Sequence, residues 1–193
     1  MNRFTPEIII AFVIVGGILL GAFVLSSGEN NTAGRIGTLQ GVNVLSPKAP
    51  RYVEIVDPSG FVNTDSLELK DLVGEKVIIL DFMTYSCINC QRTFPYLVSW
   101  YEKYKDEGLE IVGIHTPEFA FEKNIENVRK AMREFSITFP IVLDNDYATW
   151  RAYDNHYWPH KYLIDIHGNI VYDHIGEGSY AETELKIQEL LAE

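Results

Sequence analysis

The stretch VIILDFMTYSCINC, residues 77–90, joins an apolar run to a pair of cysteines. Residues 77–82 are apolar at every position except Asp81, which is typical of a central strand buried on both faces of a sheet. Beyond Cys87 the pattern becomes helical, because large apolar residues recur at the spacing of one helix face, at Leu97, Trp100, Tyr101 and Tyr104. The sequence therefore predicts a strand that leads into a Cys-x-x-Cys motif at the start of a helix.

This position favours redox chemistry at the two cysteines. The thiolate is the reactive form of cysteine, and the unpaired N–H groups at a helix start stabilise negative charge. We therefore expect Cys87 to attack a substrate disulfide and Cys90, one helical turn further on, to resolve the mixed disulfide. A structural disulfide, half of a metal site and a chance pairing are the alternatives. No metal site is predicted, because zinc would need further ligands, which His115 and His160 could supply only through the fold.

The chain from residue 49 onward alternates predicted strands and helices. A strand at 52–56 is expected to form a hairpin with the segment around Phe61, and a second hairpin is expected around His167-Gly168. The other expected elements are a short helical stretch at 67–72, strands at 109–114, 139–143, 162–166 and 169–174, and helices at 119–135, 147–153 and 180–191. The helix at 119–135 would place Phe121 on its apolar stripe. This order predicts an α/β fold with a mixed central sheet flanked by helices on both faces.

The charge balance argues against a nucleic-acid partner. The 193 residues include 27 acidic and 16 basic side chains, which gives a net charge of -11. Binding to nucleic acid would require clustered Lys and Arg side chains that neutralise phosphates. We interpret the acidity as a solvated surface around a packed core, for which an apolar fraction of 47% is sufficient.

Residues 8–25 form an uncharged apolar run that is long enough to cross a membrane as a helix. Arg3 precedes the run and Glu29 follows it, so the charge bias predicts a cytoplasmic N-terminus. The expected organisation is a cytoplasmic segment at 1–7, a transmembrane signal anchor at 8–25, a linker at 26–48 and a folded domain at 49–193. This predicts a single-pass protein of the cytoplasmic membrane with an extracytoplasmic catalytic domain. A cleaved signal peptide is the alternative.

Two stretches resemble a known family. TYSCINCQRT, residues 84–93, and GIHTPEF, residues 113–119, look like the C-terminal thioredoxin-like domain of DipZ-type proteins. Residues 49–193 are similar to the thioredoxin superfamily, in its TlpA/ResA-like and alkyl hydroperoxide reductase-like branch. The resemblance implies a thioredoxin-like fold, a thiol–disulfide oxidoreductase acting on protein thiols and disulfides, and no cofactor beyond the Cys87–Cys90 disulfide. It also implies a separate membrane electron donor of the CcdA/DsbD type, since the chain lacks the multispan domain of DipZ-type proteins.

The resemblance further assigns roles outside the motif. Asp81, six positions before Cys87, matches a buried acid that shuttles protons and would accept the proton of Cys90. Trp158 and Pro159 match the cis-proline loop that binds the substrate chain opposite the cysteines.

Thr84, His115 and Glu118 are candidate modulators of the reactive thiol. His115 and Glu118 follow the second predicted strand, at the end where ligands gather in open α/β sheets, although a loop histidine and a helix-start carboxylate would look the same. Thr84 lies three positions before Cys87, as the threonine of a thiol peroxidase would, but Leu80 occupies the position of the proline that peroxiredoxins need. A thiol peroxidase and a copper-binding thioredoxin-fold chaperone are the rival functions.

The residues around the cysteines leave the redox direction open. Ile88-Asn89 between the cysteines and Tyr85-Ser86 before them both depart from the family pattern. An anchored extracytoplasmic domain of this branch favours a reductant, because such domains reduce disulfides of specific proteins.

Overall fold

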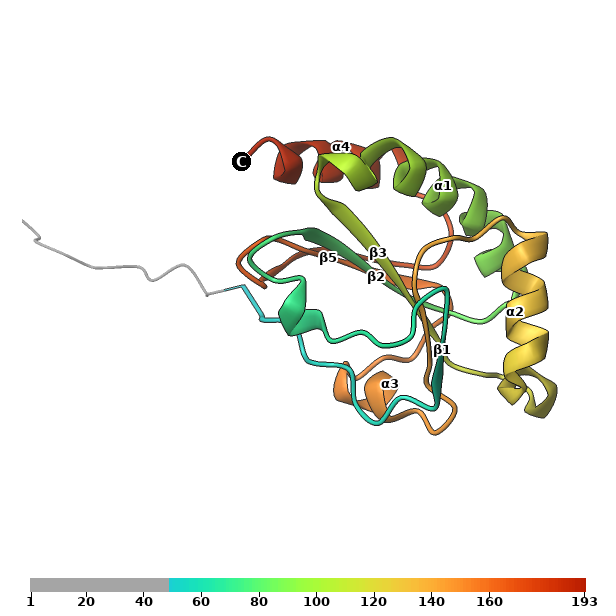
Figure 1. Ribbon diagram of the computed structural model, residues 1–193. Helices are drawn as coiled ribbons and strands as arrows, with labels where there is room; N and C mark the ends of the chain where they lie inside the picture. Colours follow the sequence, from blue (N-terminus) through green and yellow to red (C-terminus); the bar gives the residue numbers. More distant parts are fainter. Residues whose placement is uncertain (1–48) are drawn as a thin grey trace, which may run out of the picture. The chain divides into compact units, whose positions relative to one another are not determined.

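Six strands form one mixed sheet within residues 49–193, the part of the chain that the computed structural model describes (Figure 1). The strands are β1 (Gly60–Val62), β2 (Val77–Met83), β3 (Leu109–His115), β4 (Ile141–Leu143), β5 (His160–Ile164) and β6 (Ile170–Ile175). Their order across the sheet is β1-β4-β3-β2-β5-β6. The three central strands β4, β3 and β2 run parallel to one another. The remaining pairs are antiparallel: β1 pairs with β4, β5 with β2, and β6 with β5. The predicted mixed sheet is confirmed.

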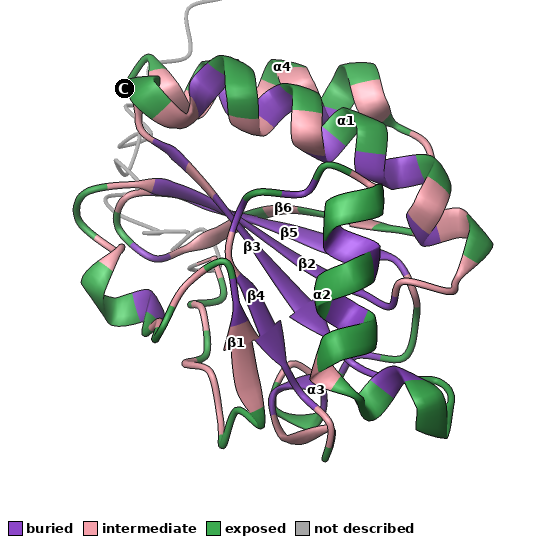
Figure 2. Cartoon of the chain, turned by 45° about the vertical axis from the view of Figure 1, so that its right-hand side comes forward, coloured by how far each residue is buried: buried purple, intermediate pink, exposed green. Residues whose placement is uncertain are grey.

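Helices cover both faces of this sheet. On one face lie α1 (Ile88–Tyr104), α2 (Ile125–Glu134) and α4 (Tyr180–Leu191), and α1 and α4 lie side by side in Figures 1 and 2. The other face carries α3 (Ala148–Ala152) and the short 3-10 helix η1 (Leu69–Asp71). Two further 3-10 helices lie in connections: η2 (Lys105–Glu107) between α1 and β3, and η3 (Ala120–Lys123) between β3 and α2. The predicted α/β class with helices on both faces is therefore confirmed.

Strand β2 is buried along its whole length, as its apolar sequence predicts (Figure 2). Ile79 and Met83 point toward the helices α1, α2 and α4, whereas Ile78 and Phe82 point toward α3. Successive side chains of a strand point to opposite faces, so β2 joins the two halves of the core. The sole charged side chain of this strand, Asp81, lies on the α1 side.

The predicted hairpin near residues 52–56 is wrong. Strand β1 pairs instead with β4, with Gly60 opposite Leu143, and Arg51 forms an isolated bridge with Asn169. Tyr52 and Ile55 pack against the core on the α3 side without joining the sheet. The alternation of apolar and polar residues at 52–56 therefore arises because the segment packs one side against the core. In the sequence this pattern cannot be told from that of a strand.

The single long helix predicted at 119–135 is also wrong, because the chain breaks into η3 and α2. Asn124 caps α2, and its Oδ1 accepts a hydrogen bond from the N–H of Glu126 at 2.8 Å. The cap starts a new helix and frees the preceding residues from the apolar stripe. Phe121 is consequently 54% exposed.

The predicted N-terminal segment at 1–7, transmembrane helix at 8–25 and linker at 26–48 lie outside the described residues. Among residues 49–193, no helix combines the length and the apolar character needed to cross a membrane.

Candidate active site

Cys87 lies at the junction between the loop after β2 and the first turn of α1, as the sequence predicts. It is the N-cap of the helix and is partly exposed. A hydrogen bond from the Cys90 thiol lowers the pKa of Cys87 to about 6, and the backbone N–H groups of Cys90 and Asn89 act in the same direction, while burial and Glu118 oppose them. A large share of this thiol is therefore ionised at neutral pH.

Cys90 is in the opposite environment. It is fully buried on the core side of α1, and both cysteines are free thiols. Burial raises the pKa of Cys90 well above its ordinary value, and the nearby carboxyl of Asp81 raises it further. The two thiols of the motif thus differ strongly, since Cys87 is partly exposed and easily ionised whereas Cys90 is buried and protonated.

Asp81 is buried beneath this motif, and neither of its carboxyl oxygens has a hydrogen-bond partner. Burial raises the pKa of Asp81 to about 7, although the positive charge of Lys161 opposes this. Lys161 is the cross-strand neighbour of Asp81 in β5 and is itself fully buried. The carboxyl therefore titrates close to neutral pH, which suits a group that accepts and releases protons.

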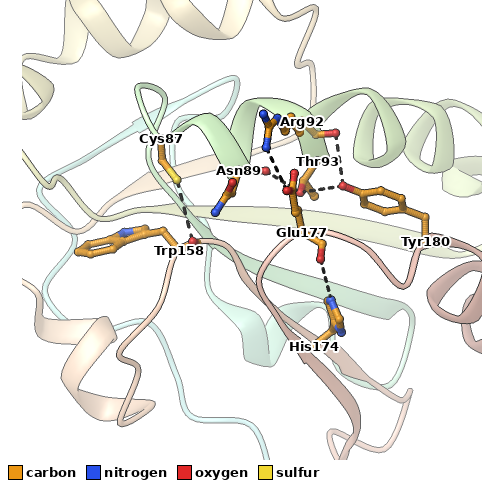
Figure 3. A network of polar contacts seen from close by, with 8 residues as sticks. All are labelled: Cys87, Asn89, Arg92, Thr93, Trp158, His174, Glu177 and Tyr180. Atoms are coloured by element: carbon orange, nitrogen blue, oxygen red, sulfur yellow. Dashed lines mark hydrogen bonds and ion pairs between the residues drawn. The ribbon is translucent and has the colours of Figure 1, made fainter.

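The Trp158–Pro159 peptide bond is cis, as the family resemblance implies. It brings the carbonyl oxygen of Trp158 to 3.9 Å from Sγ of Cys87 (Figure 3). The Trp158 indole N–H donates to the carbonyl of Thr116 at 3.1 Å, and the N–H of Gly176 donates to the carbonyl of Pro159 at 2.8 Å. These bonds fix the loop opposite the reactive thiol.

The buried carboxylate of Glu122 connects the loop between β2 and α1 to the segment that follows β3. Its Oε1 accepts hydrogen bonds from Oγ1 of Thr84 and Oγ of Ser86, both at 2.5 Å. Its Oε2 accepts from the backbone N–H groups of Glu118 at 2.6 Å and Phe119 at 2.8 Å. These hydrogen bonds lower the pKa of Glu122 against the effect of burial, so the carboxylate is ionised and fully paired.

His115 lies beside this carboxylate and is fully buried. Its ring stacks on Tyr85 with a centroid distance of 5.6 Å, and its Nε2 lies 3.4 Å from Oγ1 of Thr84. Burial lowers the pKa of His115 to about 4, so the imidazole is neutral at physiological pH. His115 therefore contributes shape and polarity behind the loop, and no positive charge.

Polar contacts also hold the first turn of α1 from the side of the β6–α4 loop (Figure 3). The guanidinium of Arg92 pairs with Glu177 at 3.1 Å, and the Tyr180 hydroxyl donates to the carbonyl of Arg92 at 3.5 Å. Oγ1 of Thr93 donates to the carbonyl of Asn89 at 2.9 Å. Since Asn89 lies between the two cysteines, these contacts help to fix the motif.

Residues 49–173 match the model of the AhpC/TSA family. The chain belongs to the AhpC/TSA family. DipZ of Mycobacterium tuberculosis is 50% identical over 136 residues, which are 69% of this chain but 19% of DipZ. Thiol-disulfide oxidoreductase ResA of Bacillus subtilis is 34% identical over 119 residues, 60% of this chain and 63% of ResA.

Solved structures confirm the thioredoxin-like fold of this AhpC/TSA domain. A thioredoxin-like protein in its oxidised form superposes with a TM-score of 0.68 at 26% identity, over 75% of this chain and 96% of that one. The predicted resemblance to DipZ-type and ResA-like proteins is likewise confirmed.

The AhpC/TSA domain brings most of the predicted site residues together. Asp81 lies beneath Cys90, the Trp158 carbonyl faces Cys87, and Thr84 and His115 meet behind the loop that precedes Cys87. Glu118 differs from the other two candidate modulators because it is exposed and acts on the thiol only through its charge. The catalytic roles of all these residues stay predictions.

Two buried charged residues, Glu122 and Lys161, were not predicted from the sequence. Glu122 fell within the helix predicted at 119–135, where a glutamate looks solvent-exposed. Its position three residues after Phe119 is the spacing at which a glutamate turns back to the N–H groups of a preceding loop, and this signal could have identified it. Lys161 fell one residue before the predicted strand at 162–166, whereas β5 begins at His160.

We expect Glu122→Ala to lower the free energy of unfolding by about 2–4 kcal/mol, because two backbone N–H groups and two hydroxyls lose a buried charged acceptor. Glu122→Gln keeps the shape and should lose less. Urea unfolding followed by circular dichroism measures both. Glu126→Ala, at an exposed glutamate paired only with Arg129, is the matched control, with an expected change below about 0.5 kcal/mol. Equal losses at positions 122 and 126 would contradict the proposed contribution of Glu122.

Proposed function

We propose that this chain is a membrane-anchored, extracytoplasmic thiol–disulfide oxidoreductase that exchanges disulfides with protein substrates and acts as a reductant. The observation that carries the proposal is the contrast between the two thiols, a partly exposed Cys87 with a lowered pKa and a buried Cys90 with a raised one. The similarity to ResA, a thiol-disulfide oxidoreductase, supports it.

The reaction begins with the Cys87 thiolate, which attacks one sulfur of the substrate disulfide. This forms a mixed disulfide and releases the other substrate sulfur as a thiolate, which takes up a proton from solvent. The substrate chain lies along the cis-proline loop, next to the Trp158 carbonyl that already faces the thiol.

Resolution requires the buried thiol. Asp81 accepts the proton of Cys90, and the resulting thiolate attacks the sulfur of Cys87 in the mixed disulfide. The second substrate sulfur leaves as a thiolate and is protonated. The products are a substrate dithiol and a Cys87–Cys90 disulfide, so two electrons have passed from the enzyme to the substrate, and no further cofactor is needed.

Turnover then needs a donor of two electrons. We assign this to a separate membrane protein of the CcdA/DsbD type, which would reduce the Cys87–Cys90 disulfide. The apolar run at 8–25 would hold the domain at the membrane surface near such a donor.

The rival functions have less support. Peroxide activation needs a free hydroxyl and an arginine at the thiol, but the Thr84 hydroxyl donates to Glu122 and the Arg92 guanidinium pairs with Glu177. Copper delivery would need a further ligand, and within residues 49–193 no group of three His, Cys, Asp or Glu side chains is arranged to hold a metal.

Two assays on the purified full-length chain in detergent separate these functions. We expect the reduced protein to reduce insulin and glutathione disulfide, and to consume hydrogen peroxide no faster than an ordinary thiol. Rapid peroxide turnover without disulfide exchange would replace the proposal with a peroxidase. The reduction potential of the Cys87–Cys90 couple tests the direction, since a value near about -270 mV fits a reductant and one near about -120 mV an oxidant.

A further inference from the structure

Large apolar side chains are exposed around the reactive thiol. Within residues 49–193, nine large hydrophobic side chains are exposed, and four of them lie in the motif, beside the cis-proline pair, or next to Tyr85 in the loop before Cys87. Ile88 follows Cys87 directly, and Tyr157 precedes the cis-proline pair. The other two, Phe119 and Phe121, lie on the η3 segment. Exposed apolar side chains gathered at one place mark an interaction surface.

Phe119 and Phe121 form the largest part of this surface. Their rings stack in parallel, with centroids 5.6 Å apart and an angle of 5° between the planes, and they are 49% and 54% exposed. Phe121 also meets the edge of Tyr85, two residues before Cys87, at 6.2 Å. The pair therefore continues the loop that ends in the reactive thiol.

The segment that carries the two phenylalanines is firmly held. The Glu122 carboxylate accepts hydrogen bonds from the N–H groups of Glu118 and Phe119, and the Asn127 amide donates to the carbonyl of Phe121 at 2.9 Å. The Tyr147 hydroxyl donates to the carbonyl of Pro117. A rigid segment cannot turn its rings into the core, so the apolar area stays in water until a partner covers it. Such preorganisation lowers the entropic cost of binding.

A negative charge lies next to the aromatic pair. Glu118 is exposed and precedes Phe119 directly. It is close enough to Cys87 for its negative charge to raise the pKa of that thiol. A partner with a basic side chain at this position would gain attraction to Glu118, whereas an acidic one would be repelled.

We propose that Phe119, Phe121 and Glu118 form a docking site for protein substrates whose disulfide is flanked by a bulky apolar and a basic side chain. The proposal rests on the function proposed above. A substrate chain extended along the cis-proline loop projects alternate side chains to each side of its cysteine, and those directed toward η3 reach the two phenylalanines and Glu118. The aromatic pair gives affinity, and the charge selects among apolar substrates.

Three cyclic peptides with one intramolecular disulfide test this site on the reduced full-length chain. They carry Phe and Lys, Ser and Lys, or Phe and Glu beside the first cysteine. We expect the second-order rate constant for reduction of the Phe/Lys peptide to exceed that for each of the others by about tenfold. The double variant Phe119→Ser/Phe121→Ser should lose the preference for Phe over Ser, and Glu118→Gln the preference for Lys over Glu. The control Leu185→Ser, which removes an equally exposed apolar side chain from α4, should keep both preferences.

Glutathione disulfide separates this proposal from the function on which it depends. A wild-type protein that reduces neither glutathione disulfide nor any peptide would overturn the oxidoreductase function itself. If it reduced glutathione disulfide and all three peptides at equal rates, or if the variants kept the wild-type preferences, the docking site alone would be wrong.

Discussion

Replacing Cys87 with Ser is expected to reduce disulfide exchange by on the order of a thousandfold or more, because the one solvent-accessible thiolate of the described domain disappears. Cys90→Ser should act differently. Cys87 would still attack substrate, but no thiol could resolve the mixed disulfide, so a covalent adduct should accumulate. Rates of insulin reduction and mass spectrometry of the intact protein measure the two effects.

The sequence has no cysteine besides Cys87 and Cys90, so each single variant retains one thiol and an adduct can be assigned to it without further mapping. The double variant, which has no thiol, is the control for adducts formed elsewhere. Adducts on Cys87→Ser but not on Cys90→Ser would reverse the assigned roles. Full activity in both single variants would rule out the mechanism.

The local part of the site was predictable because neighbouring residues determine it. A strand buried on both faces, two cysteines three positions apart and a helical stripe are all encoded within residues 77–104, and the structure places Cys87 at the helix start accordingly. The cis peptide at Pro159 was not predictable from its neighbours, since a trans surface proline fits them as well. The family resemblance supplied that feature.

The rest depended on contacts between residues far apart in the chain. Strand β1 pairs with residues 79 to 83 positions later, in β4, and no local pattern specifies that pairing. The Glu122 carboxylate accepts a hydrogen bond from Thr84, 38 positions earlier in the sequence, because the two residues follow the neighbouring parallel strands β3 and β2. Lys161 is opposite Asp81 only through the register between β2 and β5. Buried charges of this kind look like surface residues until the fold brings their partners close.

The exposed Phe121 shows a second limit. Its spacing from Ile125, Val128 and Met132 matches a buried helical stripe, but the Asn124 cap divides the segment and turns Phe121 to solvent beside the active site. Periodicity measures which residues could share a face and says nothing of whether a partner covers it. Helical periodicity therefore predicts burial wrongly for an apolar side chain that the function requires to be exposed.

Asp81→Asn is expected to slow the resolving step by on the order of 100-fold, because an amide cannot accept the proton of the buried Cys90. Formation of the mixed disulfide at Cys87 should change far less, so the mixed disulfide should persist in the variant as it does, more completely, in Cys90→Ser. Acid quenching during a single turnover, followed by thiol alkylation, gives its lifetime. A lifetime equal to that of wild type would exclude Asp81 as the proton acceptor.

The same substitution should stabilise the protein, and only above a certain pH. The pKa of Asp81 rises from 3.8 to about 7 on folding, so this carboxyl costs little stability below about pH 4. Its cost grows between about pH 4 and pH 7 and stays constant at higher pH, where the carboxyl is ionised in both states. At pH 8 the gain in Asp81→Asn should be about 4 kcal/mol, falling toward zero near pH 4. Asp146→Asn, at an exposed carboxyl, is the matched control and should shift stability by less than about 0.5 kcal/mol at either pH. Urea unfolding at pH 4 and pH 8 measures the difference. A gain at position 81 that is independent of pH would mean that burial of the ionised carboxyl is not its cause. Asp81 would then not be a proton carrier near neutral pH.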